Sequence, residues 1–354
     1  MQNYNIFFLY MPHLTKINSL TFVGKFIHEF LCTDIENYSI FQKEFHDKII
    51  RAEIENPWFT KDNILFCLEY WAENLTQEKL SHWLSKYNFS KHKNDKIGII
   101  MAGNIPMVGF HDALCVLLAG FSAKIKLSTK DKILIPFLLN YWKELDPSIE
   151  FEFIERVTGI DKLIATGSDN TSKYFEYYFK EIPHIIRKNR TSVAVLNGNE
   201  TKEELENLSK DIFTYYGLGC RNVTQLFLPK EFKINHIFEA VFSYKEVINH
   251  NKYGNNYDYH KAIFLLNRDN FWDNNFLLLK ESNAIFSPIS VLNFSFYEDL
   301  KEIENFIMEN ENKIQCIVSN ENFPFETVTF GQSQLPMLDT YADGIDTMQW
   351  ICEN

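Results

Sequence analysis

Short apolar runs alternate with longer helical patterns from residue 96 onward, and this alternation restricts the fold more than any other feature of the chain. Three runs have the length and composition of buried strands: KIGIIMAG (96–103), AKIKLS (123–128) and KLIATGS (162–168). Helical patterns follow them at 105–120, 131–145 and 170–180. Strands that alternate with helices form βαβ units, so we predict an α/β fold with mostly parallel sheets.

The chain of 354 residues is long enough for two domains. Before the first predicted strand the sequence is helical, as over 62–87, where apolar residues recur at intervals of three and four. A second α/β unit begins near Thr191. Its expected elements are strand 192–198, helix 201–216, strands 223–229, 276–280 and 290–296, helix 298–309 and strand 316–320. We therefore predict a first domain over 1–190 with a helical N-terminal region, a second over 191–325, and a C-terminal segment over 326–354 that packs back on the first.

Charge and cysteine usage exclude several classes of partner and site. The formal net charge of −12 disfavours nucleic acid and anionic membranes, which are bound through clustered Lys and Arg. We expect no integral membrane segment, because no apolar run approaches about 18 residues, and the start of the chain lacks the features of a signal peptide. The six cysteines form no CxxC pair. We therefore expect no metal site, no disulfide framework and a cytoplasmic location.

Cys220 is the candidate nucleophile. It lies in YYGLGCRNV, between a predicted helix and a predicted strand, and glycines at 217 and 219 leave its thiol uncrowded. The charge of Arg221 beside it would lower a thiol pKa from about 8.5 toward roughly 3.5–7.5. The alternative is a buried structural cysteine, the usual fate of a lone Cys. The other cysteines lie in apolar patterns and are expected in the core: Cys32, Cys67, Cys115, Cys316 and Cys352.

Polar residues and glycines follow three predicted strands directly. Asn104 could donate a hydrogen bond to an oxyanion, although on the residues alone a helix N-cap is favoured. Lys126 could hold a ribose or phosphate or be simply solvated, and Ser128 could cap the next helix. The Gly167–Ser168 turn could accept a phosphate, but it lacks a full GxGxxG. Ligands bind at the carboxyl ends of parallel strands, so we assign Lys126, Ser128, Gly167 and Ser168 to cofactor binding.

Together these segments resemble the LuxC-type acyl-CoA reductase family, a branch of the aldehyde dehydrogenase superfamily. The resemblance runs from about residue 60 onward. It is carried by MAGNIPMVGFHDALCVLLAGFSAKIKLSTKD (101–131), RTSVAVLNGNET (190–201), DIFTYYGLGCRNVTQLFLP (211–229) and AIFSPISVLNFSFYEDL (284–300). It implies an aldehyde-dehydrogenase-like fold, in which a Rossmann-type cofactor domain is joined to an α/β catalytic domain that carries the nucleophile.

The resemblance also implies roles for matching positions. Cys220 falls on the thiol nucleophile, and Asn104 on the asparagine whose amide forms an oxyanion hole with the nucleophile's own backbone N–H. Lys126 falls on the lysine that contacts the adenosine ribose or a 2′-phosphate. Gly167 and Ser168 fall on the turn beneath the pyrophosphate, and Phe286 on the phenylalanine near the nicotinamide.

Two departures from the superfamily pattern favour reduction. Hydrolytic members carry a glutamate base before the nucleophile domain, but here the region reads HIIRKNRTSV (184–193), with no carboxylate. Ala284 stands where many members have a ribose-binding glutamate. Without a base to activate water, an acyl-enzyme is better suited to accept hydride than to hydrolyse.

The resemblance therefore implies NADPH-dependent reduction of an acyl-CoA, of long-chain fatty acyl type, to an aldehyde through an acyl-cysteine, with NADH as the alternative cofactor. The expected partners are an acyl-CoA or acyl-protein thioester, an acyl-transferring enzyme and a second copy of the chain in a homo-oligomer. Two other functions stay open at this point. One is an NAD(P)-dependent aldehyde dehydrogenase that oxidises aldehydes, and the other is a non-catalytic subunit that binds acyl thioesters.

Overall fold

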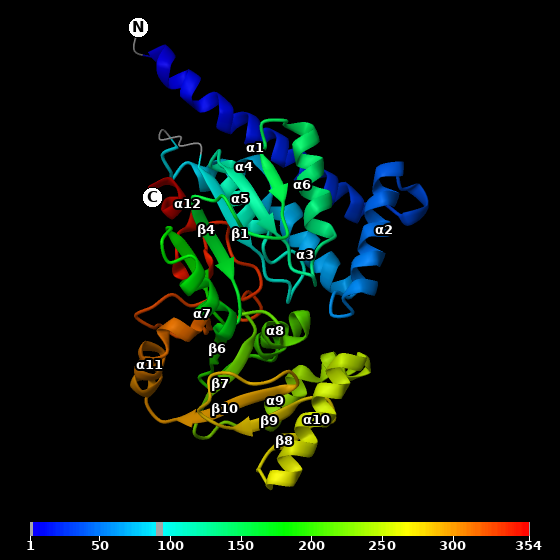
Figure 1. The fold of residues 1–354 in the computed structure, drawn as a ribbon. Helices are drawn as coiled ribbons and strands as arrows, with labels where there is room; N and C mark the ends of the chain where they lie inside the picture. The colour runs from blue at the N-terminus through cyan, green and yellow to red at the C-terminus, as the bar shows by residue number, and fades with distance from the viewer. Residues whose placement is uncertain (1–2, 90–94, 354) are drawn as a thin grey trace. The chain divides into compact units, whose positions relative to one another are not determined.

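The computed structural model describes residues 3–89 and 95–353 and forms two compact units (Figure 1). Unit 1 consists of 1–188 and 337–354, and unit 2 of 189–336. The predicted boundaries lie at 190 and 325, whereas the units divide after 188 and after 336. Residues 326–336 stay with unit 2 because Val328 bridges to the last residue of a unit 2 strand, and the amides of Gly331 and Ser333 donate to the carboxylate of Asp211 at 2.6 and 2.9 Å.

The N-terminal part of unit 1 is helical, as predicted. Its helices are α1 (Asn3–Cys32), α2 (Ile40–Glu55), α3 (Lys61–Asn74) and α4 (Gln77–Leu84), with a short 3-10 helix, η1 (Ile35–Asn37). The helical pattern over 62–87 corresponds to two helices, because the Thr76 hydroxyl accepts the Lys79 N–H and starts a new helix. Cys32, expected in the core, is exposed at the end of α1. Among the described residues, no helix is both long and apolar enough to cross a bilayer.

The sheet of unit 1 has five parallel strands in the order β3-β2-β1-β4-β5. In that order they span Phe151–Phe153, Ser122–Lys126, Lys96–Ile100, Lys162–Thr166 and His184–Arg187. Ile99 of β1 pairs with Ile125 on one side and Ile164 on the other, and all three are buried. The remaining elements of unit 1 are α5 (Phe110–Leu118), α6 (Leu134–Leu145), α7 (Asp169–Tyr178), η5 (Ala342–Gly344) and α12 (Thr347–Glu353). The C-terminal helix α12 packs against α5 (Figure 1).

The sheet of unit 2 has six strands in the order β11-β6-β7-β10-β9-β8. In that order they span Ile314–Val318, Thr191–Val195, Val223–Pro229, Val291–Tyr297, Leu278–Glu281 and Trp272–Asp273. All neighbours are parallel except β8 and β9. The helices are α8 (Lys202–Phe213), α9 (Asn235–Ala240), α10 (Asn251–Asn267) and α11 (Leu300–Glu309), with 3-10 helices η2 (Thr214–Gly217), η3 (Val241–Asn249) and η4 (Glu311–Lys313). The predicted α/β architecture with mostly parallel sheets is therefore confirmed.

Candidate active site

The loop that carries Cys220 has an unusual backbone. It joins α8 to β7 through η2, and Tyr215, Tyr216 and Gly217 all adopt left-handed angles, with φ of 55°, 58° and 79°. A non-glycine residue held in this region costs on the order of 1–3 kcal/mol, and it persists only where its surroundings determine it. Such angles favour glycine, but Tyr215 and Tyr216 adopt them as well as Gly217. The loop is therefore strained at Tyr215 and Tyr216, a few residues before the candidate nucleophile.

The side chain of Asn222 holds this loop in place. Asn222 is fully buried, and its Nδ2 donates to the carbonyls of Asp211, Ile212 and Thr214 at 3.1, 3.2 and 2.8 Å. Its Oδ1 accepts the N–H of Gly219 at 2.7 Å. One amide thus joins the last turn of α8 to the residue before Cys220. These hydrogen bonds satisfy backbone groups that the kinked chain cannot pair in a helix.

Cys220 itself is half-buried, and its carbonyl accepts a hydrogen bond from the Ser192 hydroxyl at 3.1 Å. The same hydroxyl lies 3.0 Å from the sulfur of Cys316. Burial raises the pKa of the Cys316 thiol, while the charge of Arg221 acts against this increase. The charge of Arg221 therefore acts on the Cys316 thiol in the structure, and its expected effect on Cys220 stays a prediction. Cys220 and Cys316 therefore share one serine hydroxyl, on which their two loops meet.

Side-chain hydroxyls connect the Cys220 loop to the Phe286 loop within unit 2. Thr191 donates to the carbonyl of Asn222 at 3.2 Å and lies 2.6 Å from the hydroxyl of Thr224, which donates to the carbonyl of Ile285 at 2.6 Å. The neighbouring Phe286 is 43% exposed. The two loops precede the parallel strands β7 and β10, so both lie at the amino edge of the sheet. The structure therefore brings the predicted nucleophile and Phe286 to the same edge of unit 2.

In unit 1, Asn104 lies exposed in the loop after β1. The helix-cap interpretation of Asn104 is wrong, because α5 begins only at Phe110 and its N-cap is Gly109. The chain between them turns through Met107, whose φ is 56° and whose N–H donates to the buried carboxyl of Asp131 at 2.7 Å. This turn delays the helix and leaves Asn104 on an irregular loop at the carboxyl end of the central strand.

Lys126 and Ser128 lie at the end of the adjacent strand β2. Lys126 is the exposed last residue of that strand. The Ser128 hydroxyl accepts the Lys130 N–H at 3.2 Å and does not cap α6, which begins only at Leu134 without a side-chain cap. A Cβ at Gly103 would lie 2.5 Å from the Ser128 hydroxyl, so only glycine permits the loops after β1 and β2 to pack this closely.

The Gly167–Ser168 turn follows β4 and opens α7. The Ser168 hydroxyl accepts the Thr171 N–H at 3.4 Å as the N-cap, and a Cβ at Gly167 would meet Phe175 at 3.1 Å. The glycine therefore permits close packing of the turn on its helix. Asp169 in the first turn places a carboxylate where the helix end would otherwise favour a phosphate. A phosphate at this turn would have to be held against that charge.

The strand order of unit 1 reverses at β1, which has β2 on one side and β4 on the other. Ligands of doubly wound sheets bind beyond the carboxyl ends of the strands at such a reversal. The turns at Asn104 and at Gly167–Ser168 follow these two strands, β1 and β4. The topology of unit 1 thus has the reversal at which doubly wound sheets bind their ligands.

Comparisons with known proteins bear on the fold. No protein-family model matches the sequence, and no curated protein sequence is significantly similar to it. Solved structures do match. An aldehyde dehydrogenase of Mycobacterium tuberculosis, complexed with NAD+, gives a TM-score of 0.60 at 13% identity over 87% of this chain and 73% of that one. An indole-3-acetaldehyde dehydrogenase of P. syringae, in complex with NAD+ and IAA, gives a TM-score of 0.62 at 12% identity over 87% of this chain and 72% of that one.

Aldehyde dehydrogenase 21 of Physcomitrella patens, solved with the reaction product succinate, gives a TM-score of 0.62 at 10% identity over 87% of this chain and 72% of that one. The chain has an aldehyde-dehydrogenase-like fold. The predicted fold is confirmed, and identities this low establish nothing finer than the fold. Within this aldehyde-dehydrogenase-like fold, the roles of individual residues rest on the geometry described above.

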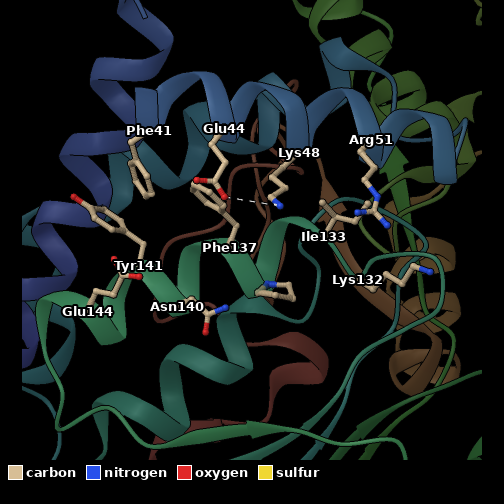
Figure 2. A pocket seen from close by; sticks show the side chains of 11 residues that line it. Phe41, Glu44, Lys48, Arg51, Lys132, Ile133, Phe137, Asn140, Tyr141 and Glu144 are labelled. Atoms are coloured by element: carbon tan, nitrogen blue, oxygen red, sulfur yellow. Dashed lines mark ion pairs between the residues drawn. The ribbon is translucent and has the colours of Figure 1, made fainter. Parts of the chain in front are cut away.

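A groove of about 530 Å³ lies between α2 and α6 of unit 1 (Figure 2). Its floor is aromatic, and its rim carries cations that pair with glutamates. Lys48 lies 3.9 Å from Glu44, while Arg51 and Lys132 lie 3.0 and 3.1 Å from Glu55. The groove contains none of the predicted site residues, and its charges are balanced. We therefore do not assign it to the reaction.

Asp131 gives a test of the loop that carries Asn104. Burial raises the pKa of its carboxyl to about 7, although the hydrogen bond from Met107 acts in the opposite direction. The folded state therefore binds a proton that the unfolded state has released, so stability falls as the pH rises from about 4 through about 7.

We expect the free energy of unfolding of the wild type, relative to Asp131→Asn, to fall by on the order of 2 kcal/mol between pH 5 and pH 8. The asparagine keeps an acceptor for Met107 but does not titrate. Urea unfolding of both proteins across this range measures the difference. A difference that does not change with pH would show that Asp131 does not titrate in this way.

Proposed function

We propose that this protein reduces an acyl thioester to an aldehyde, with Cys220 as the covalent nucleophile and NADPH as the reductant. The observation that carries the proposal is the Cys220 loop on an aldehyde-dehydrogenase-like fold. Its thiol is half-buried, and the backbone before it is strained and held by a buried amide. A fixed, accessible thiol suits covalent catalysis, and strained backbone concentrates at functional sites.

Unit 1 supplies the support for a nicotinamide cofactor. The similar enzymes of M. tuberculosis and P. syringae were solved with NAD+. We propose that Lys126 and Ser128 after β2, and Gly167 and Ser168 after β4, hold the dinucleotide in this chain, with Phe286 near the nicotinamide. NADPH is the proposed form and NADH the alternative. When bound, the cofactor supplies hydride to the acyl carbon.

The remaining chemistry belongs to the chain. The Cys220 thiolate attacks the thioester carbonyl carbon, the bond from that carbon to the CoA sulfur breaks, and CoA leaves as a thiolate that takes up a proton. The backbone N–H of Cys220 and the amide of Asn104 donate to the oxyanion, each worth about 3–4 kcal/mol in comparable sites. After hydride addition, the Cys220 sulfur departs as the aldehyde carbonyl forms. One thioester, one NADPH and one proton thus give one aldehyde, one CoA and one NADP+.

Reduction is favoured over hydrolysis because the stretch that precedes the nucleophile domain carries no base for water. Residues 184–193 contain no carboxylate. Asp211 lies close to the Cys220 loop, but its two oxygens accept the amides of Gly331 and Ser333. Its carboxylate thus has a structural task, which argues against the alternative of an aldehyde dehydrogenase that makes acids.

The test is to mix the protein with acyl-CoAs of increasing chain length and NADPH. We expect NADPH oxidation that matches aldehyde formation mole for mole, and without NADPH an acyl group on the peptide that contains Cys220. NADH and an acylated carrier protein serve as the other reductant and acyl donor. Thioester binding without turnover would favour a non-catalytic binding subunit. Conversion of aldehyde and NAD(P)+ to acid without CoA would favour an aldehyde dehydrogenase.

A further inference from the structure

We propose that Ser192 and Asn222 are positioning residues, which fix the backbone N–H of Cys220 so that it points at the oxyanion of the reacting thioester. The proposal rests on the proposed function, because it assumes that Cys220 is acylated. It concerns two residues that do not touch the substrate and act through the peptide groups on either side of the nucleophile.

The peptide group between Gly219 and Cys220, which carries the Cys220 N–H, is held through its carbonyl oxygen. Its oxygen is the carbonyl of Gly219, which accepts the backbone N–H of Asn222 at 3.1 Å. The described backbone contains no cis peptide bond, so the Cys220 N–H points opposite to that carbonyl. Fixing the Gly219 oxygen therefore fixes the direction of the N–H that we propose as an oxyanion donor.

The peptide groups before and after it are held as well. The preceding one is fixed through the Gly219 N–H, which donates to the side chain of Asn222 at 2.7 Å. The following one is fixed through the Cys220 carbonyl, which accepts the Ser192 hydroxyl at 3.1 Å. Three consecutive peptide groups are thus constrained by two side chains and one backbone amide. Rotation of any one of them would break a hydrogen bond.

The two positioning residues stand on rigid parts of unit 2. Both side chains are fully buried, and the N–H of Ser192 donates to the carbonyl of Asn222 at 3.1 Å. Ser192 belongs to β6, and the amide of Asn222 is anchored to the end of α8. A donor held in this way needs little reorganisation when charge develops on the substrate oxygen, and that is the main source of oxyanion stabilisation.

The experiment compares two reactions of the same sulfur. Acylation by an acyl-CoA develops an oxyanion, whereas alkylation by iodoacetamide does not, so only the first needs the positioned N–H. We expect Ser192→Ala to slow single-turnover acylation of Cys220 about tenfold, because a misdirected donor loses part of the roughly 10²–10³-fold effect of a full one. Alkylation of Cys220 should stay within about twofold of the wild type, with an unchanged pH profile.

The matched control is Ser319→Ala. Ser319 is also buried in unit 2, and its hydroxyl donates to a β6 carbonyl, that of Val195, at 2.9 Å. It should change neither reaction. Asn222→Asp keeps an oxygen that accepts the Gly219 N–H, but it has no N–H groups to donate to the carbonyls at the end of α8. We expect acylation to fall about a hundredfold. If this variant proves unfolded in a thermal melt, the Ser192 and Ser319 pair decides the matter.

Each outcome points to one conclusion. A selective loss of acylation in Ser192→Ala supports the positioning role. An equal loss of acylation and alkylation, or no loss of either, overturns it, because a merely structural serine would not separate the two reactions. If the wild type is alkylated at Cys220 but never acylated there, the proposed function fails, and this result is distinct from a failure of the positioning role.

Discussion

Replacing Cys220 with serine is expected to lower the rate of NADPH-dependent aldehyde formation by roughly 10³-fold or more and to abolish acyl labelling of the loop. A serine hydroxyl is a poor nucleophile unless a base removes its proton, whereas a thiol ionises near neutral pH. The structure gives residue 220 a backbone hydrogen bond from Ser192 that does not depend on the sulfur. The folded state should therefore survive, and the loss should fall on the chemical step.

Cys352→Ser is the matched control for this experiment. Like Cys220, Cys352 is half-buried, but burial raises the pKa of its thiol to about 11. It is therefore protonated at neutral pH and a weak nucleophile. We expect the Cys352 variant to keep the wild-type rate, with the acyl group still on the Cys220 peptide. Full activity of the Cys220 variant, or acyl label on another cysteine, would contradict the assignment.

Most strands and the α/β architecture could be predicted because they follow from local patterns, although β5 and β8 lie where no strand was predicted. Buried parallel strands appear as short apolar runs, as in KIGII of β1, and the helices between them have their own period. Residues 251–267 form α10 although no element was predicted there. Buried Tyr253 and Tyr257 and exposed Leu265 and Leu266 leave this helix without a clear apolar face. Apolar residues in this segment therefore do not recur at the helical interval by which a helix is predicted from sequence.

Helix starts could not be predicted where a distant residue decides them. Two helices of unit 1 are predicted to begin near residues 105 and 131, but they begin at Phe110 and Leu134. The carboxyl of Asp131 accepts the Met107 N–H in the turn before the first helix, and this contact holds both segments outside the helices. Neither segment shows this alone, because the partners are separated by a strand and a helix.

The same limit applies to the candidate site. Cys220 could be proposed as a nucleophile from the sequence because its glycines and its position between a helix and a strand are local features. Asn222, two residues further on, gave no signal of its own, since its role depends on the kinked end of α8. Ser192 reaches the Cys220 carbonyl only because β6 pairs with β7. A candidate nucleophile can be proposed from a local motif, whereas the hydrogen bonds that hold its loop depend on the tertiary fold.

Arg187→Met is expected to destabilise unit 1 by about 3–5 kcal/mol, because it leaves the buried carboxylate of Asp112 without its cation. Arg187 and Asp112 are only 4% and 7% exposed, and they form a direct ion pair. The guanidinium also donates to the Thr347 hydroxyl at 2.7 Å. One side chain on β5 thus joins α5 to the C-terminal helix α12. Urea unfolding of the wild type and the variant measures the loss.

Two further variants distinguish the effect of breaking the buried ion pair from the effect of losing one positive charge. Lys188→Met removes a cation one position further on, but Lys188 pairs with Glu176 at the surface, so the unfolding midpoint should barely change. The double variant Asp112→Leu with Arg187→Met removes both buried charges together and should recover most of the lost stability. If the double variant is as unstable as Arg187→Met, the loss comes from packing around the arginine stem or from the lost Thr347 contact, and the unpaired carboxylate is not its cause.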